Sequence, residues 1–318
     1  MGINSKFFPD VEVAGKTDLG RKRDHNEDSL LIRAEAPLPP LIAVADGVGG
    51  ASQGKVASEM TLELLQKQLK SVDDPLDFSS QLPTIIEHIN QKVLERAQKD
   101  GVSSMGTTLT GVLFVADTAV IFNVGDSRVY RMRDGNLKQL TDDHSLVNQM
   151  IKGGMDPEEA ASRVNENIIT RMIGMDSWEG VDIFYEKITS GDIFLACSDG
   201  LNKHVEDGGI SSELKDEKLQ EIPSRLVEKA NQDGGTDNIT VAVAEIIDSG
   251  SEKLFGAFTD QDEEKQEIEV KHRFDYFWLI PILLVLLILI IGFIYREPLG
   301  TSARLVINKI MELVEVVL

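Results

Sequence analysis

Residues 107–133 read TTLTGVLFVADTAVIFNVGDSRVYRMR, and this stretch indicates the kind of fold that the chain adopts. It contains apolar runs rich in β-branched residues, which are typical of strands. Asp117 separates the first two runs so tightly that we expect a hairpin between them. Asp134-Gly135 follows the last run and is a hairpin dipeptide that leads back into Leu137 and Leu140. The stretch therefore predicts antiparallel β-structure.

Similar runs lie on both sides of this stretch. The predicted strands are Val11–Thr17, Ser29–Arg33, Leu41–Ala45, Thr107–Ala116, Thr118–Val124, Arg128–Arg133, Asp192–Ser198 and Asn238–Ile246. Apolar residues at helical spacing predict helices over Ser52–Lys70, Pro83–Lys99 and Ile222–Asn231. Strands come first, two helices follow, and more strands come after, without the alternation of a βαβ protein. We therefore expect an α+β layered sandwich and not a doubly wound sheet.

The composition excludes several classes of partner and site. The 318 residues include 32 Lys and Arg against 53 Asp and Glu, which gives a net charge of −21. A surface this acidic repels a phosphate backbone, so we expect no nucleic-acid partner. Cys197 is the one cysteine, which excludes a disulfide framework and a cysteine-rich zinc site. It lies in a strand that looks buried, so we expect no nucleophilic role for its thiol.

The carboxyl-terminal part has a different character. Residues 276–295 read YFWLIPILLVLLILIIGFIY, an uncharged stretch long enough to span a bilayer and edged by aromatic residues. We expect one transmembrane helix there, after an acidic juxtamembrane linker (248–275) and before a short tail (296–318). Basic residues flank the span on both sides, so charge does not fix its orientation. The first residues of the chain do not have the pattern of an export signal, so we expect the domain over residues 1–247 to be cytoplasmic. The predicted span would anchor it to the membrane.

Carboxylates recur at the ends of the predicted strands. Asp46-Gly47 and Asp199-Gly200 each end a strand, Asp237 precedes one, and Asn26-Glu27-Asp28 precedes another. Each is also compatible with an ordinary turn, as we interpret Asp134-Gly135, Asp207-Gly208 and Asp233-Gly234. Clustered carboxylates repel one another unless cations bridge them, and hard oxygen ligands favour Mg²⁺ or Mn²⁺ over zinc. The pattern favours a two-metal hydrolase of phosphate esters.

Segments between Val11 and Ile246 resemble, in order, the motifs of bacterial metal-dependent protein phosphatases (the PPM or type 2C family). They are TDLGRKRDHNEDS, LIAVADGVGG, GTTLTGVLF, VIFNVGDSRVYRMRDG, LTDDHSLV, IFLACSDGL and GGTDNITV. The resemblance implies a four-layer sandwich in which helices flank a pair of antiparallel sheets. It also implies a binuclear Mn²⁺ or Mg²⁺ centre that hydrolyses phosphoserine and phosphothreonine in proteins. A metal-bridging water would attack without a covalent intermediate.

The resemblance also assigns the metal ligands. By motif, Asp46 would bridge both ions and the carbonyl of Gly47 would bind one of them. Asp199 and Asp237 would complete the ligands of the second ion. Asp126 matches the aspartate that, with the Asp199 position, can hold a third and weaker metal in bacterial members.

Further positions match supporting roles. Glu27 and Asp28 would act beside the metals, through water or as outer ligands, and Asn238 would support them. Arg23 matches the arginine that holds the substrate phosphate, a role suited to its bidentate guanidinium. The insert 141–182 lies where the family has its flap, so substrate choice would be set there.

One position departs from part of the family. Val48 stands where some members have a histidine proposed as the general acid. His25, beside the phosphate-binding segment, is the histidine that we would test in its place, and His144 could face the site from the insert. The other histidines are expected at the surface: His88, His204 and His272.

The expected partners are phosphorylated proteins, including a Ser/Thr kinase or its targets near the membrane. Three alternatives remain open: a pseudophosphatase that binds phosphoproteins at the membrane, a hydrolase of small phosphoesters, and a body that only presents the membrane tail. The first is disfavoured because every expected carboxylate is present. The second would act on a small phosphoester or a nucleotide, and the absence of a glycine-rich P-loop and the acidic surface make nucleotides the less attractive substrate.

Overall fold

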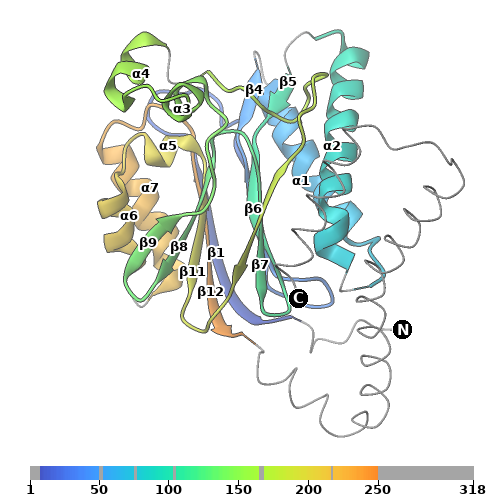
Figure 1. Ribbon diagram of the computed structural model, residues 1–318, viewed down its shortest axis with the longest axis vertical. Helices are drawn as coiled ribbons and strands as arrows, with labels where there is room; N and C mark the ends of the chain where they lie inside the picture. The colour runs from blue at the N-terminus through green and yellow to red at the C-terminus, as the bar shows by residue number, and fades with distance from the viewer. Residues whose placement is uncertain are drawn as a thin grey trace, which may run out of the picture. The chain divides into compact units, whose positions relative to one another are not determined.

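Two five-stranded sheets form the centre of the computed structural model (Figure 1). The structure describes residues 8–49, 53–74, 77–102, 105–164, 168–215 and 218–249. One sheet has the order β1 (Asp10–Asp18), β12 (Ile239–Asp248), β11 (Ile193–Cys197), β8 (Arg128–Arg133) and β9 (Asn136–Gln139). The other has the order β10 (Asp182–Lys187), β7 (Thr118–Val124), β6 (Leu109–Val115), β3 (Leu41–Ala45) and β2 (Ser29–Arg33). All neighbouring strands in both sheets are antiparallel, as predicted.

Helices cover the outer face of each sheet (Figure 1). The β3–β6 sheet packs against α1 (Gln53–Leu69) and α2 (Phe78–Asp100). The β11–β12 sheet packs against α6 (Asp207–Leu214) and α7 (Ile222–Gln232), with a short 3₁₀ helix at Leu219–Glu221. The predicted helix–sheet–sheet–helix sandwich is therefore confirmed.

The alternation of side chains along β3 explains this layering. All of Leu41–Ala45 is buried, but its residues serve two different cores. Leu41, Ala43 and Ala45 face the helices α1 and α2, whereas Ile42 and Val44 face the other sheet. Successive strand residues point to opposite faces, so an uninterrupted apolar run is what a strand between two apolar layers requires. Across the space between the sheets, the rings of Phe114 and Phe194 meet edge to face at 5.3 Å.

The two predicted hairpins are present but lie in different sheets. β6 and β7 pair in one sheet, and β8 and β9 pair in the other. The second hairpin turns at Asp134 (φ 50°) and Gly135 (φ 76°), the positive dihedrals of a type I′ turn. The chain crosses between the sheets at Gly125–Ser127, where Gly125 has φ 115°. This crossing places Asp126 between the sheets, which the hairpin pattern does not reveal.

Some boundaries differ from the prediction. The second helix begins at Phe78 and contains Pro83, because Phe78 and Leu82 are fully buried against the sheet. The predicted strand over residues 107–116 is divided: β5 (Met105–Thr107) pairs with β4 (Gly47–Gly49), and β6 follows separately. The insert holds α3 (Leu146–Lys152) and α4 (Pro157–Arg163), and its last residue begins β10.

The sheet that contains β1 joins the two ends of the domain. β1 pairs with β12 along its whole length, so that Val13 lies opposite Ala244 and Asp18 opposite Ile239. The segment after β1 therefore lies beside the segment before β12.

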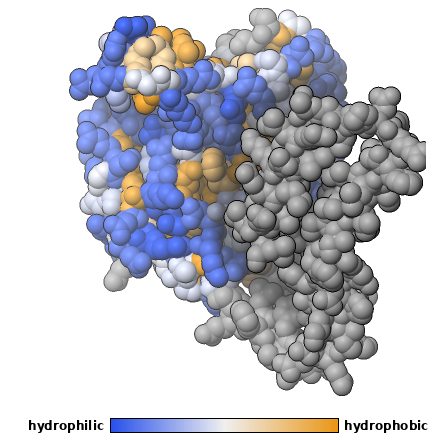
Figure 2. Space-filling model, in the orientation of Figure 1, coloured by the Kyte–Doolittle hydropathy of each residue, from blue (hydrophilic) through white to orange (hydrophobic). Residues whose placement is uncertain are grey.

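In the part of the chain that the structure describes, no helix is long and apolar enough to cross a membrane. The predicted span (276–295) and tail (296–318) lie outside the described residues, as does the predicted linker after residue 249. Where Figure 2 is coloured, hydrophilic residues predominate over scattered apolar ones.

We predict that Phe114→Ala lowers the free energy of unfolding by about 3–5 kcal/mol, because it opens a cavity between the sheets and removes the contact with Phe194. Urea unfolding would measure the change. Tyr185→Ala on the edge strand β10, where the side chain is 61% exposed, is the control and should change it by less than about 1 kcal/mol. Equal effects of the two changes would contradict the assigned core.

Candidate metal centre

The predicted carboxylates lie where strands of both sheets end. Asp46 follows β3, Asp199 opens the short helix α5 (Asp199–Asn202) after β11, and Asp237 precedes β12. Figure 1 shows α5 and β4 at the same, upper end of the sandwich. A cavity of about 190 Å³ is lined there by Arg23, Glu27, Asp46, Gly47, Val48, Gly49, Ile169, Asp199, Lys203, Asp237 and Asn238. The fold thus brings together most of the residues that the sequence analysis selected.

Asp126 lies beside this cavity in a second one. The second cavity, of about 160 Å³, is lined by Asp126, Arg128, Asp143, Ser145, Val147, Asp199, Asn202 and Lys203. Asp199 and Lys203 line both cavities. Asp126 and Asp199 therefore share one space, the arrangement that the predicted third metal site requires.

Asp28 lies deeper than the other carboxylates. Its side chain is buried, and its Oδ2 accepts a hydrogen bond of 2.7 Å from the Ser198 hydroxyl. Glu27 reaches the first cavity, whereas Asp28 does not line it. Asp28 is thus placed behind the cavity wall and next to Asp199, as an outer ligand would be.

The carboxylates repel one another strongly. Burial, and after it the charges of neighbouring carboxylates, raises the pKa of Asp28, Asp46, Asp126 and Asp199. In the described part of the chain, the Oδ1 atoms of Asp28, Asp126 and Asp199 are buried without a hydrogen-bond partner. Mg²⁺ and Mn²⁺ prefer oxygen ligands, and negatively charged carboxylates above all. The buried carboxylates of this cluster therefore fit such ions.

Cations of the protein already contact two of these carboxylates. Arg23 Nη2 lies 2.9 and 3.0 Å from the two oxygens of Asp237. Lys203 Nζ lies 2.5 Å from Asp199 Oδ2 and 3.5 Å from Asp237 Oδ2. Among the described residues, no three acidic, histidine or cysteine side chains are spaced to hold one ion as they stand. Arg23 and Lys203 are thus the cationic partners that the structure gives to Asp199 and Asp237.

Backbone contacts hold the ligand segments in place. Asn238 Nδ2 donates to the carbonyls of Leu19 and His25, and its Oδ1 accepts from the Glu27 amide at 2.8 Å. Asn238 thus fixes the loop that carries Arg23. A Cβ on Gly200 would come within 2.0 Å of the Asn238 carbonyl oxygen. The glycine after Asp199 therefore allows the segments of Asp199 and Asn238 to pack closely.

Asp46 is fixed through its own peptide groups. Its amide donates to Thr108 Oγ1 at 2.9 Å, and its carbonyl accepts from the Thr107 hydroxyl and the Thr108 amide. The sequence analysis did not select Thr107, Thr108 or Ser198, although each lies within a quoted motif. It also missed Lys203, whose one available signal is its place four residues after Asp199.

The histidines lie in different places from one another. His204 was expected at the surface, but it is only 10% exposed and its Nε2 bonds the amide and hydroxyl of Thr236, which fixes the loop before Asp237. His144 is buried; its Nδ1 accepts from the Gly125 amide and its Nε2 lies 3.0 Å from Asp182. It therefore ties the insert to the crossing that carries Asp126 and does not line either cavity. His25 and His88 are exposed, and His272 lies outside the described residues.

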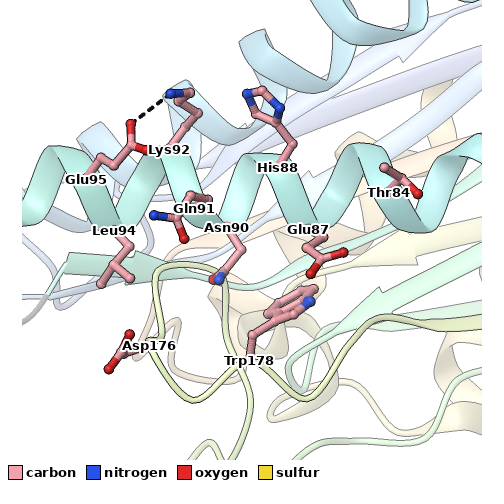
Figure 3. A pocket seen from close by; sticks show the side chains of 10 residues that line it. All are labelled: Thr84, Glu87, His88, Asn90, Gln91, Lys92, Leu94, Glu95, Asp176 and Trp178. Carbon is pink, nitrogen blue, oxygen red and sulfur yellow. Dashed lines mark hydrogen bonds and ion pairs between the residues drawn. The ribbon is translucent and has the colours of Figure 1, made fainter.

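A larger groove lies elsewhere on the domain. Figure 3 shows Glu87, Asn90 and Leu94 of α2 on the side that faces Asp176 and Trp178 of the insert. The groove has a volume of about 490 Å³. Its carboxylates are Glu87, Glu95 and Asp176, and Lys92 is paired with Glu95 at 2.8 Å. None of the predicted site residues lines it, so size alone does not locate the site. The insert reaches the metal centre through Ile169.

Comparison with known proteins agrees with this geometry. A family model described as protein phosphatase 2C matches residues 19–238. The serine/threonine phosphatase stp of Listeria innocua is 36% identical over 236 residues, which cover 72% of this chain and 94% of that protein. The solved serine/threonine phosphatase of S. agalactiae is 36% identical, with a TM-score of 0.70, over 74% of this chain and 99% of that one.

A further solved structure contains metal. The catalytic domain of the serine/threonine protein phosphatase PstP, in complex with two manganese ions, is 32% identical to this chain and has a TM-score of 0.67. The match covers 75% of this chain and 99% of that structure. The extent of the family match and the identity to these relatives lead to one conclusion: the chain belongs to the protein phosphatase 2C family.

Proposed function

We propose that this chain is a protein serine/threonine phosphatase that depends on two Mn²⁺ or Mg²⁺ ions. The observation that carries the proposal is the cavity in which Asp46, Asp199 and Asp237 converge beside Arg23. The two manganese ions of the related PstP domain support the choice of cofactor. Asp126 and Asp199 are the residues that would hold a third, weaker ion.

The chain's own residues suit an attack by water. When bound, the ions supply Lewis acidity at the phosphoryl group and at the water. Asp46, Asp199 and Asp237, with the carbonyl of Gly47, would hold them, and Glu27 and Asp28 would orient the inner ligands. Arg23 stands at the mouth with its side chain 51% exposed, so its guanidinium can pass from Asp237 to a substrate phosphate.

A covalent route has little support. Burial raises the pKa of the Cys197 thiol to about 12, so it is not a thiolate at neutral pH. No histidine is among the described residues that line the cavity, and Val48 lies where a histidine general acid would stand. The leaving alkoxide would therefore take its proton from water or from a cationic side chain of the site.

The pseudophosphatase alternative is weaker. A module that only binds phosphate has no need of several buried carboxylates, which cost free energy unless cations neutralise them. Here these carboxylates have buried oxygens without hydrogen-bond partners among the described residues.

Membrane attachment is a further part of the proposal. Residues 276–295 have the length and apolarity of a bilayer span, and the phosphatase domain would lie on the cytoplasmic side. Confinement raises the local concentration of membrane-bound partners. The proposed substrates are phosphorylated proteins near the membrane, including a Ser/Thr kinase or its targets.

We predict that Asp237→Asn lowers kcat/KM toward a phosphothreonine peptide by more than 100-fold, because loss of an inner ligand costs more than the roughly 10- to 100-fold cost of an outer one. Phosphate release by the full-length protein would be measured with Mn²⁺ and with chelator. Asp134→Asn makes the same chemical change in the β8–β9 turn and should leave activity unchanged. Full activity of Asp237→Asn would refute the metal assignment, and no turnover by a folded, Mn²⁺-binding wild type would favour the pseudophosphatase.

We predict that Arg23→Ala raises KM about tenfold with a smaller effect on kcat, because a hydrogen bond to a charged group contributes about 1.5–3 kcal/mol. Steady-state kinetics on the same peptide would separate the two constants. Lys22→Ala removes an equal charge from the exposed neighbouring residue and serves as the control. A fall in kcat at constant KM would show that Arg23 acts through Asp237 and does not anchor phosphate.

We predict that the full-length protein sediments with membranes and that deletion of residues 276–295 releases it while phosphatase activity persists. Fractionation followed by immunoblotting would measure the distribution. Replacement of the span by an unrelated transmembrane helix should restore membrane attachment. A full-length protein found in the supernatant would contradict the anchor.

A further inference from the structure

Lys203 contacts two carboxylates of the centre and lines both of its cavities. It is the first residue after α5, one helical turn beyond Asp199, and its ammonium lies 2.5 Å from Asp199 Oδ2. The same ammonium lies 3.5 Å from Asp237 Oδ2, and the side chain is only 27% exposed. Lys203 lines both cavities, so its charge lies between the predicted two-metal site and Asp126.

The surroundings of Lys203 are strongly acidic. Burial opposes its charge, but Asp199, Asp237 and Asp46 outweigh this effect and raise the pKa of the lysine. Its charge in turn lowers the pKa of Asp199 and of Asp126 against the effect of burial. The ammonium contacts Asp199 and Asp237 at once, so its position offsets part of the repulsion between these carboxylates.

Arg23 does not share this role fully. It contacts Asp237 alone among the carboxylates of the centre, and half of its side chain is exposed, so solvent weakens its field. Lys203 contacts Asp199 from within the wall shared by the two cavities. The less exposed cation therefore has the larger electrostatic effect on the cluster.

The ligand oxygens explain why Lys203 matters for metal binding. Divalent ions lie about 2.1 Å from carboxylate oxygens. An ion on Asp199 Oδ2 would then lie within about 5 Å of an ammonium that is 2.5 Å from the same oxygen. Charges of the same sign repel strongly at that distance in a partly buried site. The ammonium and the metal thus compete for the same carboxylates.

We propose that Lys203 is an internal counter-ion of the carboxylate cluster, which stabilises the metal-free centre and sets the metal concentration at which the centre fills. The proposal rests on the metal centre of the proposed function. The metal-free domain would keep its fold because the lysine partly neutralises Asp199 and Asp237. Metal would enter only at concentrations sufficient to displace the lysine.

Lys203→Gln in the full-length protein tests the proposal. Titration calorimetry with Mn²⁺ should give a Kd about tenfold lower than that of the wild type, equivalent to ~1.4 kcal/mol. In EDTA the variant should unfold at a lower temperature than the wild type, and saturating Mn²⁺ should close this gap. Neither readout requires phosphatase turnover.

Two matched variants separate charge from structure. Lys203→Arg keeps the charge and should retain a Kd within about threefold of the wild-type value. Lys229→Gln removes an equal charge from α7, where the lysine is paired with Glu213 at 3.4 Å, and should change neither readout.

The outcomes are distinct. Weaker or unchanged Mn²⁺ binding by Lys203→Gln would overturn the proposal, as would an unchanged melting temperature in EDTA. Equal gains in affinity from Lys203→Gln and Lys229→Gln would overturn it by showing an effect of net charge alone. Failure of the wild type to bind Mn²⁺ would overturn the metal centre itself, and with it the role of Lys203.

Discussion

The repulsion among carboxylates at the common end of the two sheets is the constraint on which the rest of the structure depends. Burial raises the pKa of Asp28, Asp46, Asp126 and Asp199, and the charges of neighbouring carboxylates raise it further. Such a cluster persists only if the surrounding structure is rigid and cations are near. The sandwich supplies the rigidity through three apolar cores, and Arg23 and Lys203 supply the positive charge.

Side chains that form hydrogen bonds with backbone groups hold the site in place. Asn238 joins the loop after β1 to the start of β12, and the Thr107–Thr108 segment holds both peptide groups of Asp46. His204 fixes the loop before Asp237 in a similar way. These bonds leave the carboxylate oxygens themselves free to exchange partners. The centre therefore combines fixed backbone positions with carboxylates that contact Arg23 and Lys203 and that, in the proposed function, would exchange these cations for metal ions.

Local patterns predicted the strands and the carboxylates at their ends well, because apolar alternation and turn dipeptides act over short distances. The five buried residues of β3 and the type I′ turn at Asp134-Gly135 are of this kind. The pattern did not reveal that the two hairpins lie in different sheets, since that depends on packing across the whole domain. The sequence analysis did not identify the roles of Lys203 and His204 for the same reason. Their roles arise from contact with a loop more than 30 residues away in the chain.

The pairing of β1 with β12 also bears on how the protein is made. Arg23 and Glu27 follow the first strand of the domain, whereas Asp237 directly precedes the last one. A ribosome must therefore complete nearly the whole domain before the cavity can close, and until β12 is made the β11 edge of its sheet stays unpaired. The candidate site is thus completed late in synthesis. A chain that ends before β12 would carry the earlier motif residues but not the assembled centre.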